Sequence, residues 1–162
     1  MTAHTLDTRT ELDLLGTSAA ILIVGTGGDR VLLTLTDGWI WDDYDFLFGT
    51  SVDPAVEPPL WVRMRFDGPR TLTVIAKGGV EVGRPRVEDM TVVLVIDGKT
   101  FTNRAGFCEL VVHEAEFDRG ATISQGSYRA VSAFGELSCT GVEEIRTGER
   151  LSFSAAFTLN DS

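Results

Sequence analysis

The sequence predicts an all-β protein, a single antiparallel β-barrel of about eight strands with a short N-terminal segment in front of it. Two observations predict this fold. Apolar and polar residues alternate with a period of two over most of the chain, as in strands with one buried face. Glycine, Asp-Gly and proline interrupt the alternating runs at short intervals, as turns between antiparallel strands do. We expect one domain over residues 18–162, with residues 1–17 forming the N-terminal segment.

Turn signals separate several of the expected strands. Gly27-Gly28-Asp29 is typical of a hairpin, and Asp67-Gly68-Pro69 and Asp97-Gly98 end two later strands. Residues 60–66 alternate most clearly, with four apolar side chains on one face and a tryptophan with two arginines on the other. The helical candidate is residues 10–15, a stretch too short to be stable alone. The expected strands cover residues 19–26, 30–36, 60–66, 71–76, 91–96, 107–117, 127–140 and 151–159.

Short antiparallel strands of this number form either a closed barrel or a two-sheet sandwich. Small residues favour the barrel, because they let strands bend tightly and leave room inside for a ligand. These small residues are Ala130, Ala133, Gly135, Ala155 and Ala156. The sequence therefore predicts an interior cavity of about 300–1,000 Å³.

Charge and composition argue against several classes of protein. The net charge is −10, whereas binding to nucleic acid needs a basic surface. The longest apolar run, residues 19–24, is too short to span a bilayer, so no membrane contact is expected. The first residues lack the pattern of a signal peptide, and we expect a cytoplasmic protein. Cys108 and Cys139 are then expected to be reduced, whereas an exported protein would pair them.

Patterns of catalytic or metal-binding residues are missing from the sequence. It contains no zinc-binding Cys/His spacing, no phosphate loop and no nucleophile elbow. His113 lies beside two glutamates and could act as a base, but a lone strand histidine is more often structural. The acidic residues in 42–45 alternate between faces on a strand, which favours a solvated turn over a cation site. We therefore expect neither a metal nor a cofactor.

Aromatic residues are concentrated between positions 39 and 61. Two interpretations are open, packing in the core or an aromatic wall around an apolar ligand. The residues are Trp39, Trp41, Tyr44, Phe46, Phe48 and Trp61.

Residues 121–142 resemble the C-terminal half of the bacterial spirotetronate and spirotetramate cyclases. The shared features there are Ala121-Thr122, Gly126, Tyr128, Phe134 and Thr140-Gly141-Val142. Two upstream segments resemble the same family in the same order. They are Trp41-Asp42-Asp43-Tyr44-Asp45 with Gly49-Thr50-Ser51, and Ile96-Asp97-Gly98 with Gly106.

This resemblance implies a barrel like that of allene oxide cyclase and a cofactor-independent [4+2] cycloaddition. The partner would be a linear polyketide whose diene adds to the exocyclic alkene of its own tetronate or tetramate ring. Such a reaction transfers no proton, and positioning alone can supply about 7–11 kcal/mol. Whether the protein forms a homodimer is left open.

The resemblance also implies a set of pocket-lining residues. They are Trp41 (or Ile40 if the register slips by one), Tyr44, Met64, Asp89, Met90, Leu110, Phe117, Leu137 and Cys139. Leu137 and Asp89 depart from the family, where some relatives carry a large aromatic and a tyrosine. In the spirotetramate branch an N-terminal stretch covers the barrel mouth, and Leu12 and Leu15 could form such a lid here. The alternative is a disordered tail with a few leucines.

Two other functions compete with the cyclase interpretation. One is a non-catalytic barrel that carries an apolar small molecule, which shares the cavity but lacks turnover. The other is a structural β-sandwich stapled by a Cys108–Cys139 disulfide, which predicts a filled core.

Overall fold

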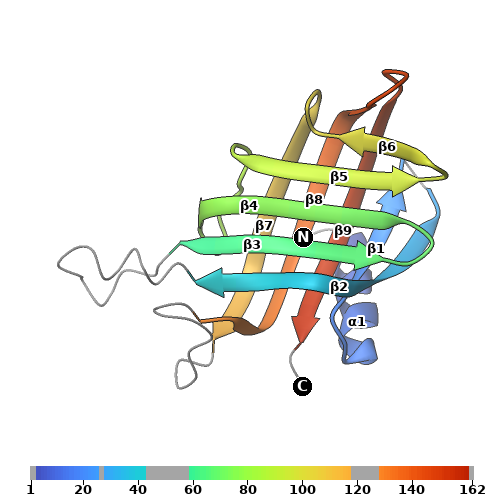
Figure 1. The fold of residues 1–162 in the computed structure, drawn as a ribbon. Coiled ribbons are helices and arrows are strands. Elements are labelled where there is room, and N and C mark those ends of the chain that lie inside the picture. Colours follow the sequence, from blue (N-terminus) through green and yellow to red (C-terminus); the bar gives the residue numbers. More distant parts are fainter. Residues whose placement is uncertain (1–2, 26–27, 43–58, 118–127, 161–162) are drawn as a thin grey trace.

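A computed structural model describes residues 3–25, 28–42, 59–117 and 128–160 of the chain. These residues form one helix and a set of nine strands (Figure 1). The elements are α1 (Ala3–Leu15), β1 (Ala19–Val24), β2 (Arg30–Asp42), β3 (Leu60–Asp67), β4 (Thr71–Val80), β5 (Met90–Ile96), β6 (Lys99–Thr102), β7 (Phe107–Phe117), β8 (Ala130–Glu144) and β9 (Arg150–Asn160).

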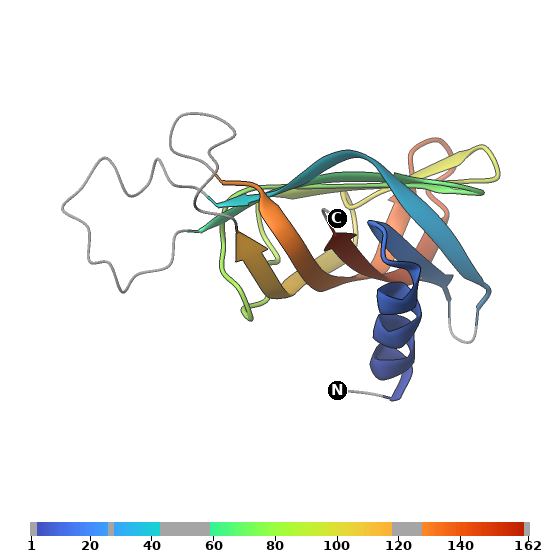
Figure 2. The ribbon, with the colours of Figure 1, turned by 90° about the horizontal axis from the view of Figure 1, so that it is seen from below.

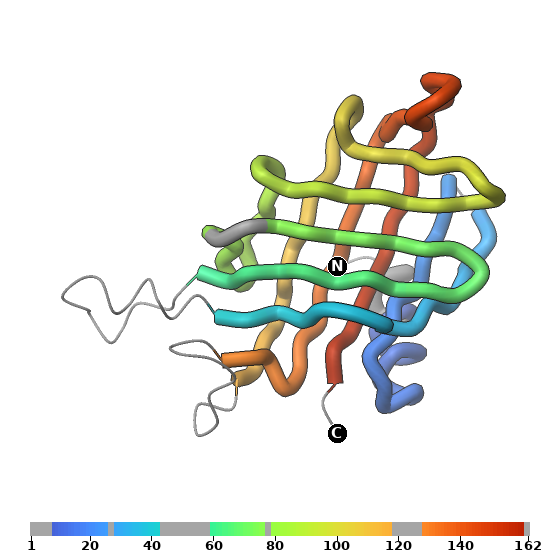
Figure 3. The backbone as a smooth tube through the Cα atoms, in the orientation of Figure 1, coloured from blue at the N-terminus to red at the C-terminus, as the bar shows by residue number. Residues whose placement is uncertain are grey.

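The strands form one antiparallel sheet in the order β6-β5-β4-β3-β2-β1-β9-β8-β7. Phe101 of β6 also pairs with Glu144 of β8, which closes eight of the strands into a barrel, with β7 beside β8. Strands β2 to β6 form one layer and cross over the layer of β7, β8, β9 and β1 (Figure 3). The barrel predicted from the sequence is confirmed, and the sandwich alternative is wrong.

The predicted alternation and turns are also found. Along β3, Leu60, Val62 and Met64 are buried while the residues between them are exposed. β1 and β2 form the expected hairpin, and Ile96 pairs with Lys99 across the turn at Asp97-Gly98. Both turn residues have positive φ, 50° and 77°, the conformation that a tight two-residue hairpin requires. Local pattern therefore fixes these strands and their buried face.

The interior of the barrel is filled by buried apolar side chains wherever the structure describes them. Phe66 and Phe157 meet there with ring centroids 6.2 Å apart. A Cβ on Gly135 would lie 2.5 Å from Cζ of Phe157 and 2.7 Å from the carbonyl oxygen of Val111. The space beside Gly135 is thus taken by an aromatic ring and a backbone, not left open for a ligand as the sequence suggested.

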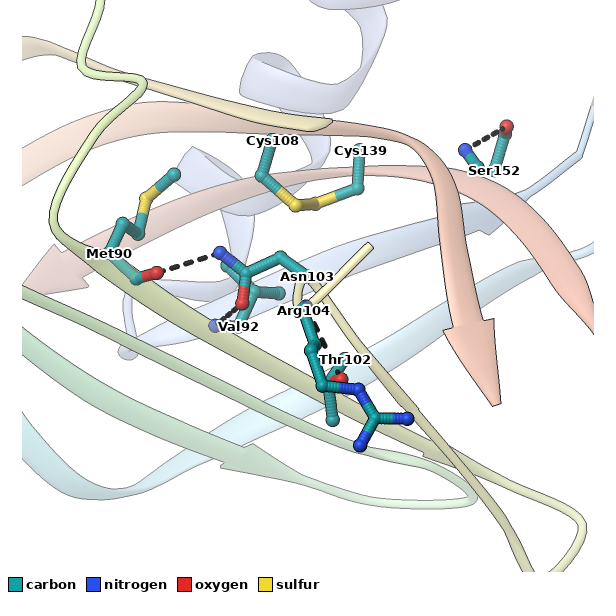
Figure 4. Close-up of a disulfide and its surroundings, with 9 residues drawn as sticks. Met90, Val92, Thr102, Asn103, Arg104, Cys108, Cys139 and Ser152 are labelled. Carbon is teal, nitrogen blue, oxygen red and sulfur yellow. Dashed lines mark hydrogen bonds between the residues drawn. A yellow bond between two sulfur atoms is a disulfide. The ribbon is translucent and has the colours of Figure 1, made fainter. Parts of the chain in front are cut away.

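A disulfide joins Cys108 of β7 to Cys139 of β8 (Figure 4). The two residues are direct cross-strand partners, and both are at most 2% exposed. The prediction that both cysteines are reduced is therefore wrong. Cross-strand register, which composition does not reveal, brings the two sulfur atoms within bonding distance.

The loop between β4 and β5 covers the outer edge of β7. The amide of Arg86 donates to the carbonyl of Leu110 at 2.8 Å, and the amide of Leu110 donates back at 2.9 Å. The amide of Gly83 donates to the carbonyl of Val112 at 2.7 Å. These bonds satisfy an edge strand that would otherwise be open, and they place Val82 beside β7.

Glu144 is the buried acidic residue at the β6–β8 junction, with 1% of its surface exposed. Its carboxylate accepts hydrogen bonds from the amides of Thr100 at 2.9 Å, Arg146 at 3.0 Å and Thr147 at 3.3 Å. Burial acts to raise the pKa of Glu144, but the three amide donors and the charge of Arg146 outweigh it. The pKa consequently lies below its ordinary value.

The helix α1 is longer than the predicted stretch 10–15 and lies on the outer side of the β1–β9 layer (Figure 2). Leu12 is 1% exposed and packs with Ile21, Phe134 and Ala156 in a second apolar cluster. Leu15 is 44% exposed. The described part of α1 therefore covers the outside of the barrel. The lid expected from Leu12 and Leu15 would close over the barrel interior. In the structure, Leu12 instead packs against the outer face of the barrel.

Candidate functional site

The structure brings together four of the residues that the resemblance placed in a pocket. Met64, Leu110, Leu137 and Cys139 all face the barrel interior and are at most 1% exposed. Leu110 and Leu137 are direct partners across β7 and β8. Met90 and Phe117 are partly buried and pack against the same cluster.

Trp41 and Asp89 do not join this group. Trp41 pairs with Trp61, which is 45% exposed, whereas the neighbouring Ile40 is fully buried in the interior. The side chain of Asp89 is 84% exposed, in the loop before β5. Ile40 rather than Trp41 therefore faces the interior, which is the alternative register considered for this strand. The placement of Asp89 in a pocket is wrong. Tyr44 lies outside the described residues.

A groove of about 530 Å³ lies between α1 and the ends of β7, β8 and β9. The sequence did not predict it. Leu12 of α1, Val82 of the β4–β5 loop and Phe134 of β8 provide apolar walls. Strand pairing places Glu114, Phe134 and Thr158 in one row across the groove and Glu116, Ser132 and Asn160 in the next. Three consecutive strands and one helix therefore build the site.

Arg9 is the cation of this groove, and its charge is already balanced. Its guanidinium lies 4.6 Å from the centre of the Phe134 ring, a cation–π contact. It also forms ion pairs with the carboxylate of Glu114 and, at 3.7 Å, with Oδ2 of Asp13. The contacts with Phe134 and Glu114 hold α1 against the barrel, whereas the pair with Asp13 lies within the helix.

His113 lies next to this groove rather than inside the barrel. Its ring stacks on Phe134 with centroids 5.6 Å apart. Its Nε2 lies 2.8 Å from Oε1 of Glu136. The histidine is therefore part of the packing around Phe134, in line with the structural role favoured from the sequence.

Two polar groups in the groove have unused bonding capacity. Thr158 is 7% exposed, and its hydroxyl makes no hydrogen bond with any residue that the structure describes. Glu116 accepts a long hydrogen bond of 3.4 Å from Ser132 and forms no ion pair with a side chain in the described ranges, although Arg9 lines the same groove. An unpaired buried hydroxyl costs about 1–3 kcal/mol.

A smaller hollow of about 390 Å³ lies on the other side of α1. Leu14, Leu15 and Leu32 line it, and the ion pair of Arg30 with Glu11 at 2.8 Å borders it. Its lining is otherwise apolar, and polar groups that could orient a ligand are confined to this border.

One signal in the sequence could have revealed the groove. β1 is buried on both faces, with Ala20 and Leu22 inside the barrel and Ile21 outside it under Leu12. A strand that is apolar on both faces indicates a covering element. The groove itself depends on residues far apart in the chain, which pattern alone does not join.

No cluster of three or more His, Cys, Asp or Glu side chains that could hold a metal ion occurs within the described ranges. In the same residues, no helix has the length and apolar character needed to cross a membrane.

Comparisons with protein families, curated proteins and solved structures find no match. Any functional proposal from the structure therefore rests on the barrel and the groove.

Proposed function

We propose that this protein is a non-catalytic carrier that binds a small, largely apolar molecule in the groove between α1 and the ends of β7–β9. The observation that carries the proposal is the groove itself, whose lining includes Thr158, a residue with a buried hydroxyl that makes no hydrogen bond within the described part of the chain. The volume of about 530 Å³ falls within the range of roughly 300–1,000 Å³ typical of ligand sites. The lining is mixed, with apolar walls at Leu12, Val82 and Phe134 and four charged side chains beside them.

The expected result is saturable binding of N-phenyl-1-naphthylamine, a neutral apolar dye that fluoresces when it leaves water. Ser132→Trp fills the groove and should weaken binding about tenfold or more, which corresponds to about 1.4 kcal/mol. Thr73→Trp adds the same ring on β4, away from the groove, and serves as the matched control. Fluorescence titration measures affinity, and circular dichroism verifies that both variants are folded.

Two outcomes count against the groove. The dye does not bind to the folded protein, or both tryptophan variants weaken its binding equally. In the second case the dye occupies another site, and the barrel interior becomes the next region to test.

The second candidate function is the [4+2] cyclase. It is supported by the resemblance, which assigns Met64, Leu110 and Leu137 to one pocket. These residues share the barrel interior, which buried side chains fill, so a substrate there requires the interior to open. A cycloaddition needs its two reacting ends held in one pose and no acid, base or metal. The expected substrate remains a linear polyketide that carries a tetronate or tetramate ring.

The cyclase proposal predicts that a linear tetronate-bearing polyene is converted to a spiro-fused cyclohexene in the presence of a metal chelator. The rate should be nearly constant between about pH 6 and 9, because no proton is transferred. Leu137→Trp should change the rate or the stereochemical outcome, whereas His113→Ala on the outer face should leave both unchanged. Chromatography with mass detection measures the product. Binding without turnover supports the carrier, and loss of activity on chelation contradicts the cycloaddition.

The disulfide bears on where the protein works. Disulfides persist in oxidising compartments and are reduced in most cytoplasms. The Cys108–Cys139 bond therefore favours a location outside the reducing cytoplasm, in place of the cytoplasmic location expected from the sequence.

A further inference from the structure

We infer that the ligand of the groove is an amphiphilic organic cation, a protonated amine on an apolar body. This inference rests on the proposed binding function and names the chemical class of the ligand. The groove offers an apolar wall on one side and an unmatched negative charge on the other. A molecule with both an apolar part and a positive charge can contact the apolar wall and pair with the negative charge at the same time.

The charges of the lining favour a cation. Among the described residues that line the groove, three carry carboxylates, Asp13, Glu114 and Glu116, and one carries a guanidinium, Arg9. Arg9 is engaged by Asp13 and Glu114, which leaves the carboxylate of Glu116 without a cationic partner in the described part of the chain. The net charge of −10 adds a long-range field of the same sign.

The geometry gives each part of such a ligand a place. Glu116 lies in the outer row with Ser132 and Asn160, at the rim of the groove. Thr158 lies one row further in, between Phe134 and Ala19, the first residue of β1. An ammonium group at Glu116 would therefore leave the apolar body of the ligand between Leu12 and the strands, within reach of the row that holds the Thr158 hydroxyl.

The same geometry disfavours an anionic ligand. A carboxylate in the groove would face the three acidic side chains and would compete with Glu114 and Asp13 for the guanidinium of Arg9. The bond to Glu114, together with the contact between Arg9 and the Phe134 ring, also holds α1 against the barrel. Anion binding would thus weaken the contact that forms one wall of the site.

Displacement of the dye by three ten-carbon compounds tests this inference. Decylammonium, 1-decanol and decanoate share one apolar body and differ in charge, and each is used below the concentration at which it aggregates. We expect decylammonium to bind about fivefold more tightly than decanol and decanoate to bind most weakly. Added sodium chloride should weaken decylammonium binding and leave decanol binding unchanged.

Substitution of Glu116 locates the effect. Glu116→Gln should weaken decylammonium binding about fivefold and leave decanol binding unchanged. Glu109→Gln removes a carboxylate from the same strand away from the groove, and it should leave both affinities unchanged.

The outcomes separate the two proposals. Equal affinity for the three compounds overturns the cationic ligand while dye binding in the groove stands. A decylammonium preference that survives Glu116→Gln overturns the assignment of Glu116. If neither the dye nor any of the compounds binds, the binding function itself is wrong.

Discussion

Replacing Cys108 and Cys139 together with alanine is expected to lower the free energy of unfolding by about 3–4 kcal/mol. The bond joins residues 31 positions apart in the sequence. It lowers the conformational entropy of the unfolded chain, because the loop between the two cysteines stays closed there. Guanidinium unfolding, followed by tryptophan fluorescence, measures the change. Reduction of the wild-type protein should produce a loss of similar size.

The alanine pair also supplies the control for reduction. Its unfolding midpoint should be the same with and without reductant, because it has no cysteine left. An unfolding midpoint of the wild-type protein that is insensitive to reductant would show that Cys108 and Cys139 are not bonded in solution.

Gly135→Ala should destabilise the barrel by about 1–3 kcal/mol, the usual cost of overpacking a filled core. The added methyl group would lie 2.5 Å from Cζ of Phe157, so the ring or the strand has to move. Chemical denaturation of the purified variant measures the loss. An unchanged stability would mean that space does exist beside Gly135, as an interior cavity requires.

A double-mutant cycle identifies the clash. Phe157→Leu alone creates a void and costs stability, but it also vacates the space that the new methyl group needs. The two substitutions together should therefore cost less than the sum of the single changes. Additive effects would assign the cost to the carbonyl of Val111 instead.

Local pattern predicted much of the barrel because the features concerned lie close together in the sequence. The alternation in β3 and the hairpin at Asp97-Gly98 each need fewer than ten consecutive residues to be recognised. The number of such strands left a barrel and a sandwich open, and the small residues favoured the barrel. These predictions required no knowledge of distant partners.

The remaining features depend on register and on distant contacts. The pairing of β2 with β3 shifts between Leu35 and Asp37, and Ile40 rather than Trp41 faces inward. No composition signal marks such an irregularity. The groove needs α1 and three strands in place at once, so its polar rows appear only after folding. Asp89 was placed by resemblance alone, and its exposed turn shows the limit of that inference.

The pairing of β1 with β9 has a consequence for when the barrel can form. The first and last strands are neighbours, with Ala19 opposite Thr158. A chain emerging from the ribosome can complete the meander from β1 to β6 early, but one side of β1 has no partner until β9 has been synthesised. Contacts so distant in sequence also slow folding. The nascent chain therefore carries an open, apolar sheet edge through most of its synthesis, and this is the interval in which it is most exposed to aggregation.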